Sequence, residues 1–198
     1  MYRPAAFAAD DDVAIALVDA HPLAHLVVIA DGEMMSSPVP LIRRGDALVG
    51  HLARPNPVWR HPGAALAIFT GVEAYVSPRW YANKPVDGKV VPTWNYTTVH
   101  ARGRLVVHDE PAWTLQLVTD LTRRMEQSSN TPWSVTDAPA DYVEALVRGV
   151  VGIELVGVTF EGKAKLSQNK GEDDVARIAA GLAAGSPTDQ AVAAAMQD

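Results

Sequence analysis

The stretch LAHLVVIADGEMMSSPVPLIRRGDALVGHLA, residues 23–53, decides the fold of this chain. Its first segment, Leu23–Ala30, is apolar and rich in β-branched residues, and it therefore predicts a strand. The dipeptide Asp31-Gly32 follows, and this pair favours the tight turn of a β-hairpin because both residues tolerate a positive φ. A second turn at residues 44–46 leads into another apolar segment, Ala47–Ala53. Strands joined by turns this short run antiparallel.

The return strand of the hairpin carries two prolines, Pro38 and Pro40, two positions apart. A proline has no backbone N–H, so two prolines of equal parity remove two hydrogen-bond donors from the same side of a strand. We therefore expect this strand to lie at the edge of its sheet or to contain a bulge.

The rest of the chain adds strands and peripheral helices. Apolar or alternating segments predict further strands at 64–71 and 73–78 (two strands or one bent strand), at 95–109 and at 149–163. Periodicity and end signals predict helices at 10–20, 110–127 and 142–147, followed by two alanine-rich helices separated at Gly185.

Two features mark the helix expected at 110–127. Asp109 is expected to be its N-cap, because a carboxylate accepts hydrogen bonds from the free N–H groups of the first turn. Its apolar positions recur at helical spacing, at Leu115, Val118, Thr122 and Met125.

The order of elements predicts the architecture. Because strands are joined mostly by short turns and not by helices, we expect a mainly β protein, an antiparallel barrel with flanking helices. A doubly wound parallel sheet is not expected. The expected domains are the barrel over residues 1–170 and a helical C-terminal tail over 171–198, packed on or near the barrel.

Composition excludes several classes of protein. The chain has 198 residues, no cysteine and a formal net charge of −6. Without cysteine there are no disulfides, thiolate nucleophiles or zinc–thiolate sites. A negative protein repels the phosphate backbone of DNA, so direct DNA binding is disfavoured. No apolar run approaches the roughly 20 residues of a membrane helix, and residues 1–12 lack the apolar core of a signal peptide; we expect a cytoplasmic protein.

Common catalytic and nucleotide-binding motifs are missing from the sequence. There is no H-E-x-x-H, G-x-S-x-G, Walker or G-x-G-x-x-G pattern, and the six histidines are scattered. We therefore expect no metal site and identify no catalytic residue.

Two polar clusters stand out instead. The loop GHLARPNPVWRHP, residues 50–62, offers planar donors and a flat apolar wall beside stiffening prolines, in His51, Arg54, Asn56 and Trp59. The segment AKLSQNK, residues 164–170, offers Lys165 and Gln168 just after a strand. Either cluster taken alone also fits a solvated connection. Trp59, Trp80 and Trp94, however, all stand beside polar residues in loops or at strand ends.

The chain resembles a known family in seven blocks that run in the family's order. They are MYRPAAF (1–7), GHLARPNPVW (50–59), YVSPRWY (75–81), VPTWNYTTVHARG (91–103), Pro132-Trp133, GVVGIEL (149–155) and EGKAKLSQNK (161–170). The family is the PaiB type of FMN-binding negative transcriptional regulators, within the FMN-binding split-barrel superfamily. The resemblance ends near residue 170.

This resemblance implies a six-stranded antiparallel split barrel that forms a homodimer, with FMN at the dimer interface. It implies that Ser36, Ser37 and Pro38 lie along the flavin edge. His51, Arg54 and Asn56 would face the phosphate. Trp94 and Asn95 would lie near the isoalloxazine ring, with Trp59 as a further wall. Lys165 and Gln168 would close the pocket.

The implied function is regulation of transcription, and the sequence favours an indirect role because no helix-turn-helix with a basic recognition helix is visible. Two alternatives stay open. On the same scaffold, FMN would support an oxidoreductase acting on a small molecule, since the cofactor carries the redox chemistry. A flavin-free or haem-binding dimeric scaffold is the third reading.

Overall fold

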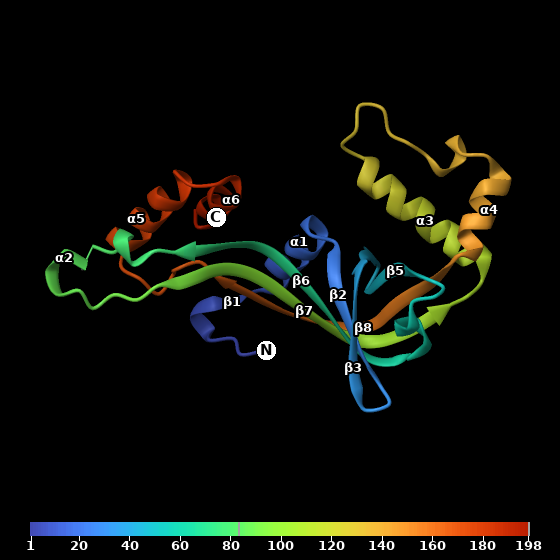
Figure 1. The fold of residues 1–198 in the computed structure, drawn as a ribbon, viewed down its shortest axis with the longest axis horizontal. Coiled ribbons are helices and arrows are strands. Elements are labelled where there is room, and N and C mark those ends of the chain that lie inside the picture. Colours follow the sequence, from blue (N-terminus) through green and yellow to red (C-terminus); the bar gives the residue numbers. More distant parts are fainter. Residues whose placement is uncertain (83, 198) are drawn as a thin grey trace. The chain divides into compact units, whose positions relative to one another are not determined.

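The structure is a computed structural model that describes residues 1–82 and 84–197 (Figure 1). The chain forms two compact units. Unit 1 comprises Met1–Ala20, Thr70–Val99 and Glu161–Asp198, and unit 2 comprises His21–Phe69 and His100–Phe160.

The eight strands among the described residues belong to one sheet of order β3-β2-β6-β7-β8-β5-β4, with β1 paired to β8. Their bounds are β1 Ala8–Ala9, β2 Leu23–Ala30, β3 Glu33–Pro40, β4 Ile42–Arg44, β5 Ala47–Ala53, β6 Gly63–Val76, β7 Thr93–His108 and β8 Val150–Lys165. The mainly β, antiparallel prediction is confirmed. Six strands have seven or more residues, and the two beyond the expected six, β1 and β4, have only two and three residues.

The helices lie between and after these strands. They are α1 Asp11–Ala20, α2 Lys84–Asp87, α3 Pro111–Glu126, α4 Ala140–Arg148, α5 Glu172–Ala183 and α6 Pro187–Ala195, with short 3₁₀ turns η1 Ala5–Phe7, η2 Pro57–Arg60, η3 Pro78–Trp80 and η4 Val135–Asp137. The segments 64–71 and 73–78 form a single strand, β6.

The hairpin of β2 and β3 has the predicted turn. Asp31 and Gly32 have φ angles of 51° and 85°, as a turn with two left-handed residues requires. The register pairs Leu23 with Pro40 and Ala30 with Glu33. The two strands are therefore in contact along their whole length.

The position of β3 explains its prolines. β3 is the first strand in the sheet order, so the prediction of an edge strand is confirmed. The N–H of Leu41 donates to the carbonyl of Pro22, at 2.8 Å, on the side of β2. Because backbone groups alternate in direction along a strand, Pro38 and Pro40 have the opposite parity, and their missing donors would have pointed away from β2.

Unit 2 closes its sheet through the chain itself. Only Leu41 separates β3 from β4, although these strands are the two ends of the sheet order. At the junction the carbonyl of Pro40 lies where a side chain on Gly50 would begin: a Cβ there would be 2.4 Å from that oxygen. Gly50 is therefore required for β5 to approach the end of β3.

The interior of unit 2 is filled by aliphatic side chains from its strands. Among its fully buried residues are Leu26, Val28, Val39, Leu41, Leu48, Leu105, Ile153 and Leu155. Their burial supplies the main driving force for closing the sheet.

Unit 1 has a core of its own. Ile178 and Leu182 of α5 and Val192 of α6 pack with Ala74, Val76 and Tyr81. The two predicted tail helices are confirmed, and the Ser186 hydroxyl caps α6 by accepting from the N–H of Asp189 at 3.3 Å. Because the tail shares its core with residues 74–81, the domain boundary at residue 170 stays a prediction.

One helix start differs from its prediction. Glu110, and not Asp109, is the N-cap of α3, and it makes no side-chain capping bond. The Asp109 carboxylate instead receives two hydrogen bonds from Arg54. A bidentate, charge-assisted pair is stronger than a bond to one backbone N–H, which explains the difference.

Among the described residues, no helix combines the length and the apolar character needed to cross a membrane.

Candidate functional site

In unit 2, the loop after β5 is tied to the edge strand. Asn56 donates through Nδ2 to the Ser37 hydroxyl at 2.8 Å. Its Oδ1 accepts from the N–H of Val58 at 3.0 Å and so caps the turn η2. Ser37 is buried, whereas its neighbours Ser36 and Pro38 are exposed. Two of the expected site segments therefore lie side by side.

The outer edge of β3 presents backbone groups that β2 does not use. By the alternation described above, the N–H and C=O of Ser36 and the C=O of Pro38 point away from β2. An edge with both a donor and acceptors can bind a flat molecule whose rim carries complementary groups.

Arg54 is engaged within the unit. Its guanidinium contacts both carboxylate oxygens of Asp109, at 2.6 and 3.2 Å, and the carbonyls of Arg148 and Val150, at 2.8 and 3.3 Å. The hydrogen bond between Arg54 and Asp109 raises the pKa of the arginine and lowers that of the aspartate. In this arrangement Arg54 joins the end of β5 to the start of β8.

Trp59 packs next to this arginine. Its indole N–H donates to the carbonyl of Arg54 at 3.0 Å, and the guanidinium of Arg60 lies 5.3 Å from the indole ring centre. The half-buried indole therefore stiffens the loop and keeps one face beside a cation.

His51 faces a different environment from Asn56. It lines an apolar cavity with residues of α3 and α4, and its Nδ1 is buried without a hydrogen-bond partner among the described residues. Burial lowers its pKa. The ring is therefore neutral at neutral pH, which does not suit a phosphate ligand.

In unit 1, lysines surround a small polar pocket. Lys165 donates through Nζ to the Thr93 hydroxyl at 2.6 Å and to the carbonyl of Trp94. Lys170 lies over the ring of Tyr81, with its Nζ 5.0 Å from the ring centre. The pocket has a volume of about 150 Å³, and its lining is Tyr81, Val91, Pro92, Thr93, Lys165, Ser167, Asn169 and Lys170.

The lining of this lysine pocket carries two lysines. None of its eight lining residues is acidic. Burial, followed by repulsion from Lys163 and Lys170, lowers the pKa of Lys165. An anion bound beside Lys165 and Lys170 would relieve this repulsion.

The other expected residues of unit 1 shape the wall of this region. Asn95 is fully buried; its Oδ1 accepts from the Ser167 hydroxyl at 3.0 Å. Trp94 is half exposed and meets Tyr75 edge to face, with ring centres 6.2 Å apart. Gln168 donates to the carbonyl of Ala164 at 2.6 Å and accepts from the N–H of Leu166, so it holds the turn.

The structure thus brings the expected residues into two groups, one in each unit. Ser37 with Asn56 forms the first, and Lys165 with the backbone of Trp94 belongs to the second. Sequence reasoning did not select Thr93 or Lys170. Lys170 follows Gln168 in the same polar motif and was recognisable there, whereas Thr93 gives no local signal because its role depends on β7 lying beside β8.

Among the described residues, no group of three or more histidines, aspartates or glutamates is arranged to hold a metal ion.

The fold defines the class first: the protein is a mainly β, antiparallel split barrel. The structure is similar to the FAD and haem binding protein of Mycobacterium smegmatis, with a TM-score of 0.61, 18% identity, and coverage of 89% of this chain and 79% of that one. This likeness concerns the fold.

The family follows from the sequence. Residues 1–157 match the family described as "Putative FMN-binding domain". The chain belongs to this family, and FMN is the cofactor that the family assignment gives it.

Two relatives set the range of similarity. Protease synthase and sporulation protein PAI 2 of Bacillus subtilis is 31% identical over 136 residues, which cover 66% of this chain and 62% of that protein. An uncharacterized protein of Emericella nidulans is 36% identical over 121 residues, 55% of this chain and 48% of that protein. The chain spans about half the length of the fungal relatives it matches.

Arg54 allows a direct test of whether it supports the fold or binds a ligand. We expect Arg54→Ala and Asp109→Asn to lower the melting temperature to a similar extent, because each breaks the same pair. If Arg54 instead served a phosphate, Asp109→Asn would leave FMN affinity intact while Arg54→Ala abolished it. Thermal unfolding and FMN titration of both variants measure the two effects.

The pair also predicts a pH dependence. The pKa of Asp109 is lowered from 3.8 in the folded protein, so its stabilising contribution is present above that value and is lost as the pH falls through the folded-state pKa. Asp109→Asn should remove this part of the acid sensitivity. An unchanged acid limb in the variant would contradict the assignment.

Proposed function

We propose that this protein binds FMN as a homodimer and acts in negative regulation of transcription in the manner of the PaiB type, without binding an operator itself. The observation that carries the flavin part is the lysine pocket of unit 1, a positive site without an acidic residue in its lining. The motif blocks that resemble the PaiB type carry the regulatory part.

FMN has three features that a binding site must match. It carries a dianionic phosphate, a flat apolar tricycle, and a rim of donors and acceptors on one side of that tricycle. The described residues offer a candidate partner for each of these features.

The lysine pocket fits the phosphate. Its volume of about 150 Å³ suits a small anion. Lys165 and Lys170 supply charge, and the hydroxyl of Thr93 supplies a neutral donor. A bound dianion would also favour the charged form of Lys165, which burial and its lysine neighbours disfavour.

The edge of β3 fits the polar rim of the ring. Ser36 offers a backbone N–H and C=O, and Pro38 offers a C=O, on the side away from β2. Asn56 stabilises this edge through Ser37. In unit 2, Trp59 offers a flat apolar surface along which a tricycle can pack, and Trp94 offers one in unit 1.

Bound FMN would supply electron or hydride transfer, which no side chain of this protein provides. In unit 1, Lys165 and Lys170 would hold the phosphate and Trp94 would shield the ring from water; the β3 edge of unit 2 is a separate candidate contact for the polar rim. No general acid or base is assigned.

Three exposed apolar residues support the homodimer. Leu23, Ile29 and Met34 of the β2–β3 hairpin are 58%, 65% and 82% exposed. Large apolar side chains gathered on an edge hairpin are typical of an interface, because their burial against a second copy removes them from water. The same hairpin offers the unpaired edge of β3, so a second copy would cover both features.

The charge of the chain supports an indirect regulatory role. The formal net charge is −6, which opposes the phosphate backbone of DNA. Salt-sensitive retention of a promoter fragment by the purified protein would contradict this part. Catalytic consumption of NADH or NADPH by the flavin-loaded protein would favour the oxidoreductase reading instead.

The lysine pocket yields a test of FMN binding. We expect Lys165→Gln to weaken FMN binding at least tenfold, which corresponds to about 1.4 kcal/mol, because a charge-assisted contact to the phosphate is lost. Arg177→Gln is the matched control: Arg177 is exposed on α5 in the same unit and does not line the pocket. Quenching of flavin fluorescence on titration measures both affinities.

The same titration has an expected pH dependence. The pKa of Lys165 is lowered from 10.5. Lys165 therefore loses its charge at a lower pH than an ordinary lysine does. Wild-type affinity should fall as the pH rises through this lowered pKa, and Lys165→Gln should not show that fall. Equal affinities of wild type and Lys165→Gln would show that the phosphate does not bind in this pocket.

The dimer has its own test. Met34→Lys should convert the dimer to a monomer, because a charge replaces the most exposed apolar side chain of the hairpin. Leu115→Lys changes an exposed leucine of α3 and should leave the dimer intact. Light scattering after size exclusion gives both masses against the 21.2 kDa chain; a wild-type monomer would overturn the proposal.

A further inference from the structure

Unit 2 contains a second hollow that the flavin proposal does not use. It has a volume of about 330 Å³, within the range of small-molecule pockets. Its walls are formed by α3, by α4 and by the segment before α4. Its floor is formed by the start of β8 and the end of β5. The lining residues are His51, Val118, Thr122, Trp133, Val135, Ala138, Tyr142, Val143, Leu146, Val147 and Val150.

The apolar stripe of α3 explains why this cavity is lined as it is. The helix buries Thr114 and Leu117 against the sheet. The stripe with helical spacing in the sequence lies on another face, and two of its members, Val118 and Thr122, line the cavity. Val118 and Thr122 therefore face the cavity, whereas Leu115 and Met125 are exposed and do not line it.

The opposite walls remain accessible. Trp133, Tyr142 and Leu146 are 48%, 57% and 55% exposed. Two aromatic rings and an aliphatic side chain that are half open to solvent around a hollow gain free energy when a ligand covers them.

His51 supplies the only imidazole in this lining. Its Nδ1 is buried without a partner, and a buried N–H without an acceptor is rarer than an unpaired acceptor. This favours the tautomer with the proton on Nε2. His51 then offers the cavity a single N–H donor on a neutral ring.

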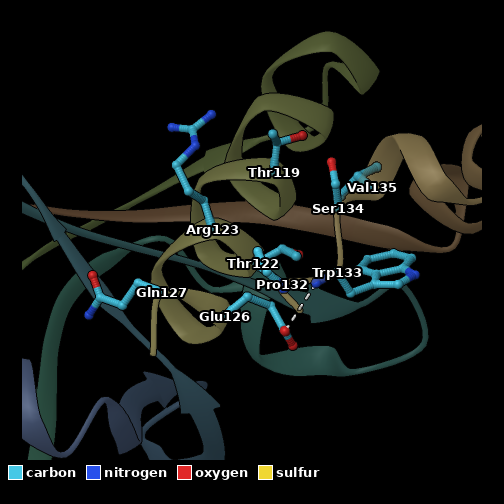
Figure 2. Close-up of a pocket in the computed structure, with 9 residues that line it drawn as sticks. All are labelled: Thr119, Thr122, Arg123, Glu126, Gln127, Pro132, Trp133, Ser134 and Val135. Atoms are coloured by element: carbon cyan, nitrogen blue, oxygen red, sulfur yellow. Dashed lines mark hydrogen bonds between the residues drawn. The ribbon is translucent and has the colours of Figure 1, made fainter. Parts of the chain in front are cut away.

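The wall formed by Trp133 is held in place from the neighbouring helix. The backbone N–H of Trp133 donates to a carboxylate oxygen of Glu126 at 3.1 Å, and Figure 2 shows the indole turned away from Arg123. Figure 2 shows the residues that line a neighbouring hollow. This hollow has a volume of about 350 Å³ and shares Thr122, Trp133 and Val135 with the cavity that His51 lines. Its rim carries Arg123 and Glu126, so charge lies outside the apolar cavity.

From this arrangement we propose that the cavity is a second ligand site, which binds a small uncharged aromatic molecule carrying one hydrogen-bond acceptor, such as a carbonyl. The apolar walls contact the ring, and the Nε2–H of His51 donates to the acceptor. A charged ligand is excluded because the lining offers no countercharge.

This site is separate from the proposed flavin contacts. The cavity lining contains neither the β3 edge nor the lysine pocket, and it includes no cation for a phosphate. The proposal therefore holds whether or not FMN binds at the other residues. It does change the expected role of His51, which serves this cavity in place of the flavin phosphate.

Two probes of equal shape test the hydrogen bond. 1-Indanone carries a carbonyl acceptor, and indane has the same ring system without it. Their dissociation constants are measured by ligand-detected NMR on the full chain with FMN present. Because indane is intrinsically more apolar, the informative quantity is the ratio of the two constants and its change on mutation.

We expect His51→Leu to weaken the binding of 1-indanone, relative to that of indane, about three- to tenfold, because one hydrogen bond is lost. Indane affinity should stay nearly unchanged, because the shape of the wall is kept. An unchanged ratio would overturn the role of His51. If the histidine variant is poorly folded, the comparison below still decides whether the cavity is the site.

The location is tested by two lysine substitutions at exposed apolar positions. Leu146→Lys places a charge in the cavity wall and should weaken both probes at least tenfold. Met125→Lys is the matched control, because Met125 is similarly exposed on α3 but does not line the cavity. Equal effects of the two substitutions, or no saturable binding to wild type, would overturn the proposal.

Two further outcomes would also overturn it. Displacement of 1-indanone by excess FMN would assign the cavity to the flavin. Conversion of a dimer to a monomer by Leu146→Lys, without probe binding to wild type, would assign this face to a second copy of the chain. Saturable binding that FMN leaves unchanged supports a separate site.

Discussion

The approach of β5 to the end of β3 is the contact on which unit 2 depends. The carbonyl of Pro40 occupies the space that a side chain on Gly50 would need, and a single residue later the chain enters β4 on the other end of the sheet order. A backbone oxygen cannot rotate away as a flexible side chain can. The closure therefore requires a glycine at this position, and it keeps the β3 edge, the loop after β5 and His51 in one unit.

The cations of the chain differ in what they are free to do. Arg54 lies in the loop after β5. Its guanidinium donates four hydrogen bonds, two to Asp109 and two to backbone carbonyls. Lys165 and Lys170 have no acidic residue in the lining of their pocket. An anion gains more from cations without a carboxylate partner, because no existing ion pair has to be broken. This difference favours the lysines of unit 1 over the loop of unit 2 as the phosphate site in the proposed FMN complex.

Exposed apolar surface appears at two places in unit 2 that call for different partners. On the β2–β3 hairpin, Ile29 and Met34 stand beside an unpaired strand edge, which a second copy can cover. Around the cavity of α3 and α4, the apolar side chains enclose a hollow with one histidine donor, which suits a small molecule. Shape distinguishes the two: an edge buries area against another chain, whereas a hollow surrounds its ligand.

The sequence by itself determined the local structure. Asp31-Gly32 required a hairpin because of its φ angles, Pro38 and Pro40 required an edge strand because they lack donors, and Ser186-Pro187 required a helix start. The seven motif blocks determined the family. Short strands such as β4 were not predicted, because three residues are too few to show the alternation of a strand.

Only the tertiary structure decided the partners of the polar side chains. Arg54 meets Asp109 across 55 positions of sequence, and Lys165 meets Thr93 across 72. Whether a cation binds a carboxylate, a hydroxyl or a ligand depends on distances between such remote segments, which no local pattern specifies. Asp109 was expected to cap α3 because the sequence near it gives no sign of its remote partner Arg54. Helical spacing likewise predicts an apolar stripe on α3, but it does not predict that Val118 and Thr122 line a cavity.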